Sequence, residues 1–197
     1  SDLKAAVEEF FWGLDVKTGR GLGLIWYKAL WCAHAARSLV NLTSYELPEE
    51  AYLAGLLHKL GQLVFLNNRP DSYGELLTRQ HTDLAICELE RELFGVPYHQ
   101  VSAAMVEEWQ MDSFLSDALL YQNEPAERLL EAPRLVRLTN FTHKLSDPGI
   151  EPETLYAEAD LLFGLTPSVI TSLVKDIDDQ VEKAAEALGI TLHRVDG

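Results

Sequence analysis

One leucine-rich stretch constrains the fold of this chain more than any other. Residues 51–66 read AYLAGLLHKLGQLVFL, and their leucines recur at intervals of three and four residues. That spacing places apolar side chains on one face of an α-helix and does not fit a strand. Pro48 and the two glutamates after it mark a helix start, because proline is tolerated in the first turn and carboxylates favour the positive end of the helix dipole. We therefore predict one core helix over residues 51–66.

The opposite face of this predicted helix carries small side chains and one imidazole. At about 100° per residue, His58 falls beside Ala54 and Gly55, away from the leucines. A glycine inside a helix costs about 1 kcal/mol relative to alanine and usually has a packing reason. We expect Gly55 to mark the close approach of another helix.

Helical periodicity continues along the rest of the chain, and no segment alternates as a strand would. A glycine-rich segment, 18–23, and a segment rich in turn formers, 67–74, are predicted breaks. Asp112 and Thr166 are predicted N-caps, Thr82 or Asp83 a cap partway along one helix, and Gly95 and Gly164 predicted stops. The fold class is all-α, with helices predicted at 3–14, 24–41, 51–66, 75–94, 97–109, 113–122, 133–145, 155–163 and 167–188.

Composition limits the possible partners and location. The 197 residues suit a single domain over 1–197, and the net charge of −15 would repel nucleic acid and an anionic membrane surface. Cys32 and Cys87 are isolated, which favours a reducing cytoplasm over a disulfide framework. The N-terminal residues lack a signal-peptide pattern, and no stretch is apolar enough for a membrane span.

Three segments resemble a known family. They are WYKALWCAHAARSLV (26–40), AYLAGLLHKLGQLVF (51–65), and the pair ELFGVPYHQVSAAMVEEWQM (92–111) and LLYQNEP (119–125). Together they resemble the HDOD domain, an HD-related output domain of bacterial signal-transduction proteins and a branch of the HD metal-dependent phosphohydrolases. The resemblance covers about 24–145, is followed by predicted helices over 153–189, and lacks the N-terminal helical half that the family usually carries. It implies an HD-domain-like multi-helix bundle.

The resemblance also identifies the positions where the related hydrolases hold a divalent metal. Carried over residue by residue, these positions are Lys28, His58, Lys59 and Asn140. A lysine ammonium has no lone pair for a metal, and one imidazole with one amide oxygen cannot form a three-ligand site. Where relatives often show paired histidines, this chain has Tyr121, Gln122 and Asn123. We therefore expect no metal, no other cofactor and no catalytic residue.

Three functions remain open. The first is a non-enzymatic signalling module that binds a protein partner or a ligand. The second is a divergent metal-dependent phosphohydrolase, in which His58, His99 and acidic residues rebuild a site. The third is a sensor that keeps the ancestral pocket for a small anionic ligand. The candidate pocket residues are Lys28, His58, Lys59, His99 and Asn140.

Each candidate residue also has a purely structural interpretation. His58 then packs the central helix with a hydrogen bond, and Lys59 is a surface or interhelical-pair lysine. The histidines at 34, 81, 143 and 193 show no ligand spacing. The four tryptophans, at 12, 26, 31 and 109, are predicted core anchors, and Phe114 is predicted to face inward from the helix that Asp112 caps.

Overall fold

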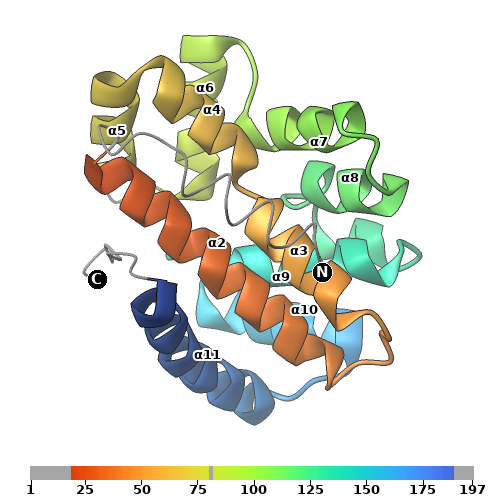
Figure 1. Cartoon of the computed structure of the whole chain (residues 1–197). Helices are drawn as coiled ribbons and strands as arrows, with labels where there is room; N and C mark the ends of the chain where they lie inside the picture. Colours follow the sequence, from red (N-terminus) through yellow and green to blue (C-terminus); the bar gives the residue numbers. More distant parts are fainter. Residues whose placement is uncertain (1–18, 80–81, 189–197) are drawn as a thin grey trace.

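The computed structural model describes residues 19–79 and 82–188, and every regular element among them is helical (Figure 1). This confirms the predicted all-α class. The predicted helix 3–14, Trp12, His81 and His193 lie outside the described residues. The elements are α2 (Gly19–Val40), α3 (Pro48–Leu57), α4 (Leu60–Asn68), α5 (Pro70–Thr78), α6 (Asp83–Phe94), α7 (Tyr98–Glu108), α8 (Ser113–Leu120), η2 (Ala126–Leu129), α9 (Arg134–Leu145), α10 (Pro152–Phe163) and α11 (Pro167–Leu188).

Helix α2 is the axis of the bundle. It packs against α3, α5, α9 and α11, and in Figure 1 it crosses the front of the molecule with α11 beside it. Its alanines, among them Ala29, Ala33 and Ala36, are fully buried and let neighbouring helices come close. A Cβ added at Gly55 would lie 2.5 Å from the backbone nitrogen of Ala33. The prediction that Gly55 marks a close helix contact is therefore confirmed.

The predicted single helix 51–66 is wrong: the chain breaks at His58 and Lys59 into α3 and α4. Side chains from distant segments stabilise the break, because the amide of Gln122 donates to the His58 carbonyl at 3.0 Å and the backbone amide of Gly61 donates to Ser102 Oγ at 2.8 Å. A Cβ at Gly61 would lie 2.1 Å from the carbonyl oxygen of Tyr98. The break thus lets α4 lie directly on α7.

One predicted break is absent, and another is much shorter than predicted. Helix α2 runs through Gly21 and Gly23, where the glycine serves packing: a Cβ at Gly21 would lie 3.2 Å from Leu66 and 3.3 Å from the Cα of Gly74. The predicted loop 67–74 is mostly helical, since α4 extends to Asn68 and α5 begins at Pro70. A proline in the first helical turn costs no hydrogen bond, so it starts this helix and does not prevent it.

Four predicted cap and stop residues agree with the structure, although several predicted helix lengths do not. Helix 75–94 is divided into α5 and α6, but Thr82 caps α6 by accepting from the amide of Ala85 at 3.3 Å. Asp112 caps α8 through the amide of Phe114 at 2.7 Å. Gly95 and Gly164 end α6 and α10 with φ of 79° and 65°, the left-handed region that glycine tolerates. The cap chemistry in the sequence therefore located these helix ends.

Two aromatic side chains that are predicted to face the core are largely exposed to solvent. Trp26 and Trp31 are buried, whereas Trp109 is 44% exposed, as the terminal residue after α7. Phe114, in the first turn of α8, is 52% exposed. Both residues lie at helix ends, where the periodic pattern does not fix which side meets the core.

No single helix among residues 19–79 and 82–188 is long and apolar enough to cross a membrane. Only α10 and α11 taken together reach that length and composition, and they meet at a bend of 104°.

Candidate functional site

A buried ion pair lies at the break between α3 and α4. The ammonium of Lys59 is 2.7 Å from Oδ1 of Asp83 and donates to the hydroxyl of Tyr98 at 2.9 Å. The Lys59 side chain is only 1% exposed and that of Asp83 only 5%. The three residues begin or precede α4, α6 and α7, so one cation joins the starts of three helices. Lys59 is therefore an interhelical-pair lysine and not a surface lysine.

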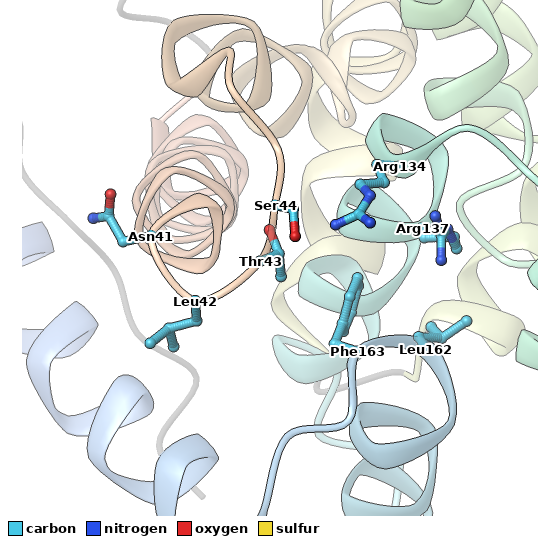
Figure 2. Close-up of a pocket in the computed structure, with 8 residues that line it drawn as sticks. All are labelled: Asn41, Leu42, Thr43, Ser44, Arg134, Arg137, Leu162 and Phe163. Carbon is cyan, nitrogen blue, oxygen red and sulfur yellow. The ribbon is translucent and has the colours of Figure 1, made fainter.

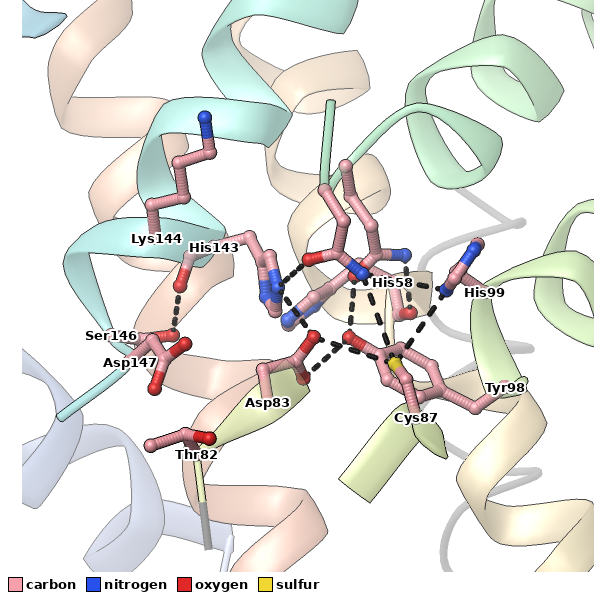
Figure 3. Close-up of polar contacts among 12 residues, drawn as sticks. His58, Thr82, Asp83, Cys87, Tyr98, His99, His143, Lys144, Ser146 and Asp147 are labelled. Carbon is pink, nitrogen blue, oxygen red and sulfur yellow. Dashed lines mark hydrogen bonds and ion pairs between the residues drawn. The ribbon is translucent and has the colours of Figure 1, made fainter. Parts of the chain in front are cut away.

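Asp83 is the centre of this network and receives donors from several sides. Figure 3 shows its carboxylate between His143 of α9 and Tyr98 of α7, and the Tyr98 hydroxyl lies 2.8 Å from Oδ1. Burial alone would raise the pKa of Asp83, but the charge of Lys59 and the contacts with Lys59 and His143 hold that pKa well below its usual range. Asp83 is thus a buried carboxylate that stays ionised because Lys59 neutralises it.

His143 fills the other side of the Asp83 carboxylate. Its Nε2 lies 3.2 Å from Asp83 Oδ2 and 2.7 Å from Asn123 Oδ1, and both partners are acceptors. Nε2 therefore carries the proton, and the buried Nδ1 has no hydrogen-bond partner. Burial lowers the pKa of His143, which keeps the imidazole neutral against the opposing influence of Asp83.

His58 lies next to His143, with ring centroids 5.3 Å apart and edge-on geometry. Its Nδ1 contacts the carbonyl of Gly55, so Nδ1 carries the proton and Nε2 is left buried without a partner. Burial and the nearby Lys59 charge lower the pKa of His58 well below its usual value. Two neutral imidazoles, each with a buried lone pair, therefore lie beside the ion pair.

The segment of Gln122 and Asn123 connects this network through contacts with Tyr98, His99 and His143. Gln122 accepts from the Tyr98 hydroxyl at 3.0 Å and donates to the carbonyls of His58 and Leu119. Asn123 contacts Nδ1 of His99 at 3.4 Å as well as His143. Burial lowers the pKa of His99 to about 4. These two amides thus connect His58 and His99 to the ion pair.

The two remaining candidates have different surroundings. Asn140 donates to three backbone carbonyls, those of Tyr121, Gln122 and Glu124, at 2.9 to 3.1 Å. It therefore holds the 121–124 segment in place from outside the ion pair. Lys28 is half-buried and makes no hydrogen bond or ion pair with the described residues. Burial and the charge of Lys59 lower its pKa to about 8.

The structure thus brings His58, Lys59 and His99 into one network, places Asn140 in a supporting position, and leaves Lys28 at the edge without a partner among residues 19–79 and 82–188. Sequence reasoning missed Asp83, Tyr98 and His143 as members. One signal was available for Asp83: Thr82 already supplies the cap of α6, which left the adjacent carboxylate without an assigned role. No such signal existed for His143, because its spacing from the other histidines matches no ligand pattern.

The donor set does not fit a metal ion. In the described part of the chain, no group of three or more His, Cys, Asp or Glu side chains is arranged to hold one. The carboxylate of Asp83 contacts His143, and the Lys59 ammonium lies against one of its oxygens. Two imidazoles and one carboxylate would be enough ligands for some catalytic metal centres, but here the carboxylate is occupied by the Lys59 ammonium and by Nε2 of His143, so these side chains do not form an available ligand set.

Solved structures of bacterial signalling proteins share this fold. The MmoQ response regulator from Methylococcus capsulatus strain Bath aligns with a TM-score of 0.61 and 26% identity, over 76% of this chain and 60% of that one. A protein with a provisional assignment to signal transduction, from Marinobacter aquaeolei VT8, aligns with a TM-score of 0.65 and 24% identity, over 84% and 38%.

An HDOD domain protein of unknown function from Geobacter sulfurreducens aligns with a TM-score of 0.59 and 18% identity, over 85% of this chain and 63% of that one. This chain therefore spans less than two thirds of the length of each of these three proteins. No curated protein matches it. The profile of the HDOD domain matches residues 3–125, which is more than half of the chain. The chain therefore belongs to the HDOD domain family.

Proposed function

We propose that this chain is a non-enzymatic regulatory module of bacterial signal transduction, which acts by binding a protein partner or a ligand. The observation that carries the proposal is the position of the Lys59 ammonium. It lies 2.7 Å from Asp83 and next to His58, where the related hydrolases place the aspartate of their His-Asp pair. A fixed cation stands where a metal-binding carboxylate would be needed.

Electrostatics supports this assignment. A divalent cation beside Asp83 would meet the positive charge of Lys59 in a buried, low-dielectric environment, where like charges repel strongly. Lys28 is a second amine close enough that the charge of Lys59 lowers its pKa. Metal binding would therefore require removal of at least one ammonium from the site, and hydrolysis would lack the metal that activates water.

The network instead suits a structural role within a binding module. Lys59 bridges the starts of α4, α6 and α7, and the 121–124 segment closes the network from α8 and α9. Breaking a buried ion pair by removing one partner typically costs about 3–5 kcal/mol. The ion pair therefore maintains the relative positions of helices whose outer surfaces are free to contact a partner. The likeness to a response regulator fits a signalling role.

Metal analysis and activity assays of the purified domain test the proposal. We expect no stoichiometric manganese, iron or zinc, and no hydrolysis of phosphomonoesters or cyclic nucleotides beyond that of a His58→Ala control. Stoichiometric metal together with phosphatase activity, both lost in His58→Ala, would overturn the proposal in favour of a divergent phosphohydrolase.

A further inference from the structure

A cavity of about 440 Å³ lies at the first turn of α9, between segments that are distant in the sequence, and none of its lining residues belongs to the buried ion-pair network. Its walls come from the loop after α2, the first turn of α9 and the C-terminal end of α10 (Figure 2). Ligand pockets commonly measure about 300–1,000 Å³, so this volume suits a small molecule. The lining residues are Asn41, Leu42, Thr43, Ser44, Arg134, Arg137, Leu162 and Phe163.

Two arginines give the cavity a positive charge, and neither forms an ion pair within the described structure. Arg134 and Arg137 are three residues apart on α9, which places them on neighbouring positions of one helix face. In Figure 2, the guanidinium group of Arg134 extends toward Ser44. Neither arginine forms a hydrogen bond or an ion pair with residues 19–79 or 82–188, and Nε of Arg137 is buried without a partner.

Several other arginines of this chain form ion pairs with glutamate. Arg37, Arg79 and Arg128 each pair with a glutamate, as expected in a protein with 31 acidic and only 16 basic residues. Burial and the charge of Arg134 lower the pKa of Arg137, with Glu131 opposing. An arginine remains charged at neutral pH even so. Two adjacent guanidinium groups that lack carboxylate partners in such an acidic chain indicate an external anion.

The backbone adds to the same positive field. Helix α9 has 12 residues, begins at Arg134, and has neither an acidic residue in its first turn nor a side-chain cap. The positive end of its dipole is therefore not compensated by a carboxylate in its own first turn or by a capping side chain. Thr43, on the facing loop, has a buried hydroxyl without a hydrogen-bond partner. Guanidinium and hydroxyl donors thus line one space at the N-terminal end of α9.

The lower wall of the cavity is apolar. In Figure 2, the Phe163 ring lies below Thr43 and Arg137, with Leu162 next to it. The Phe163 ring is held edge-on against Phe141, with centroids 5.6 Å apart. An inorganic anion alone would leave this wall without a partner. A ligand with an organic group next to its charge would use both parts of the cavity.

We propose that this cavity binds a small organic phosphate, with the phosphate group at Arg134 and Arg137 and the organic group against Phe163. A phosphate monoester carries close to two negative charges and three acceptor oxygens, which match two guanidinium forks better than a single carboxylate does. The role of such a ligand as a signal rests on the regulatory function proposed above, but its binding does not.

Adenosine monophosphate, adenosine and inorganic phosphate are suitable probes, because together they separate the phosphate from the organic group. Calorimetric titration and thermal unfolding would be measured for the unmodified domain, Arg134→Gln, Arg137→Gln and the matched control Arg128→Gln. Arg128→Gln removes the same charge from an exposed ion pair with Glu124, outside the cavity.

We expect adenosine monophosphate to bind and to raise the unfolding temperature, inorganic phosphate to bind more weakly, and adenosine not to bind. Each cavity variant should weaken binding at least about tenfold, whereas Arg128→Gln should not. No binding by either phosphate probe at millimolar concentration would overturn the proposal, as would equal affinities in Arg137→Gln and Arg128→Gln. Such a result would leave the regulatory function untouched, because metal content and phosphatase activity test that function separately.

Discussion

The ammonium of Lys59 lies 2.7 Å from the carboxylate of Asp83, and both side chains are almost completely removed from solvent. Lys59 lies at the break before α4, and Asp83 is the first residue of α6. A buried pair of this kind is costly to break, since the remaining partner becomes an uncompensated charge. The first prediction follows from this geometry.

Replacing Lys59 with methionine should destabilise the domain by about 3–5 kcal/mol, because the Asp83 carboxylate would remain buried without its cation. Urea unfolding at pH 7 measures the change. Asp83→Asn added to Lys59→Met should restore part of the loss, because the buried charge is then gone. The exposed pair of Arg79 and Glu75 serves as a control, and Arg79→Met should cost about 1 kcal/mol or less. Equal effects at the two sites would contradict the structural role of Lys59.

The buried histidines predict a loss of stability in mild acid. The pKa values of His58, His99 and His143 lie below that of a free histidine, so the unfolded chain binds more protons below about pH 6.5. Their contribution is therefore complete above pH 6.5 and declines as the pH falls. For His99 alone, with a pKa of about 4, the loss at pH 5 is about 2 kcal/mol.

Urea unfolding at pH 8 and pH 5 tests this expectation, with His99→Gln as the variant that should lose less stability between the two. Glu90 acts in the opposite direction, because burial raises its pKa to about 7 and its contribution declines as the pH rises through 7. In Glu90→Gln the loss of stability toward pH 5 should therefore be larger than in the unmodified domain. A stability that is independent of pH between 5 and 8 in both variants would contradict the directions of the pKa shifts given for His99 and Glu90.

Gly55→Ala should destabilise the bundle, because the new Cβ would lie 2.5 Å from the Ala33 backbone and α3 would have to move away from α2. Overpacking of this kind costs about 1–3 kcal/mol. Gly74→Ala is a matched control within α5, where the added Cβ would meet only Leu66 at an ordinary 3.6 Å. That control should be neutral or slightly stabilising, because alanine favours a helix over glycine. Thermal unfolding distinguishes the two, and a neutral Gly55→Ala would show that the helices are not in tight contact.

Restoring carboxylate and imidazole ligands should restore metal binding. Lys59→Asp combined with Lys28→His removes both ammonium groups and adds an acidic and a neutral ligand near His58 and Asp83. We expect stoichiometric binding of manganese, iron or zinc, measured by metal analysis after dialysis. Lys59→Met combined with Lys28→His is the control and should bind no metal. Failure of the first variant to bind metal while still folded would show that the positional correspondence with the hydrolases is wrong.

Asn140 is best left unchanged in that experiment. Adding Asn140→Asp, which the positional correspondence also calls for, would remove a donor shared by three backbone carbonyls and place a carboxylate against them. Leaving buried acceptors without their donor costs about 1–3 kcal/mol. The triple variant should therefore unfold at a lower temperature than the double variant, whatever its metal content.

The sequence by itself determined the all-α class, the family and most helix ends. Leucine periodicity acts within one helix, and the caps at Thr82, Asp112, Gly95 and Gly164 depend on residues within a few positions of one another. Such signals are local, so they can be read without knowing how the helices pack. Because these signals are local, they do not determine which side of a helix end meets the core, and the inward orientation predicted for Trp109 and Phe114 is wrong.

Only the tertiary structure decided the break at His58 and Lys59 and the membership of the buried network. The break depends on Gln122 and Ser102, which reach it from other helices. Asp83 and Tyr98 lie 24 and 39 positions from Lys59 in the chain, and their contact with it depends on the relative placement of three helices. A buried lysine is stable only where a carboxylate and a hydroxyl meet it, and that meeting is a property of the packed bundle.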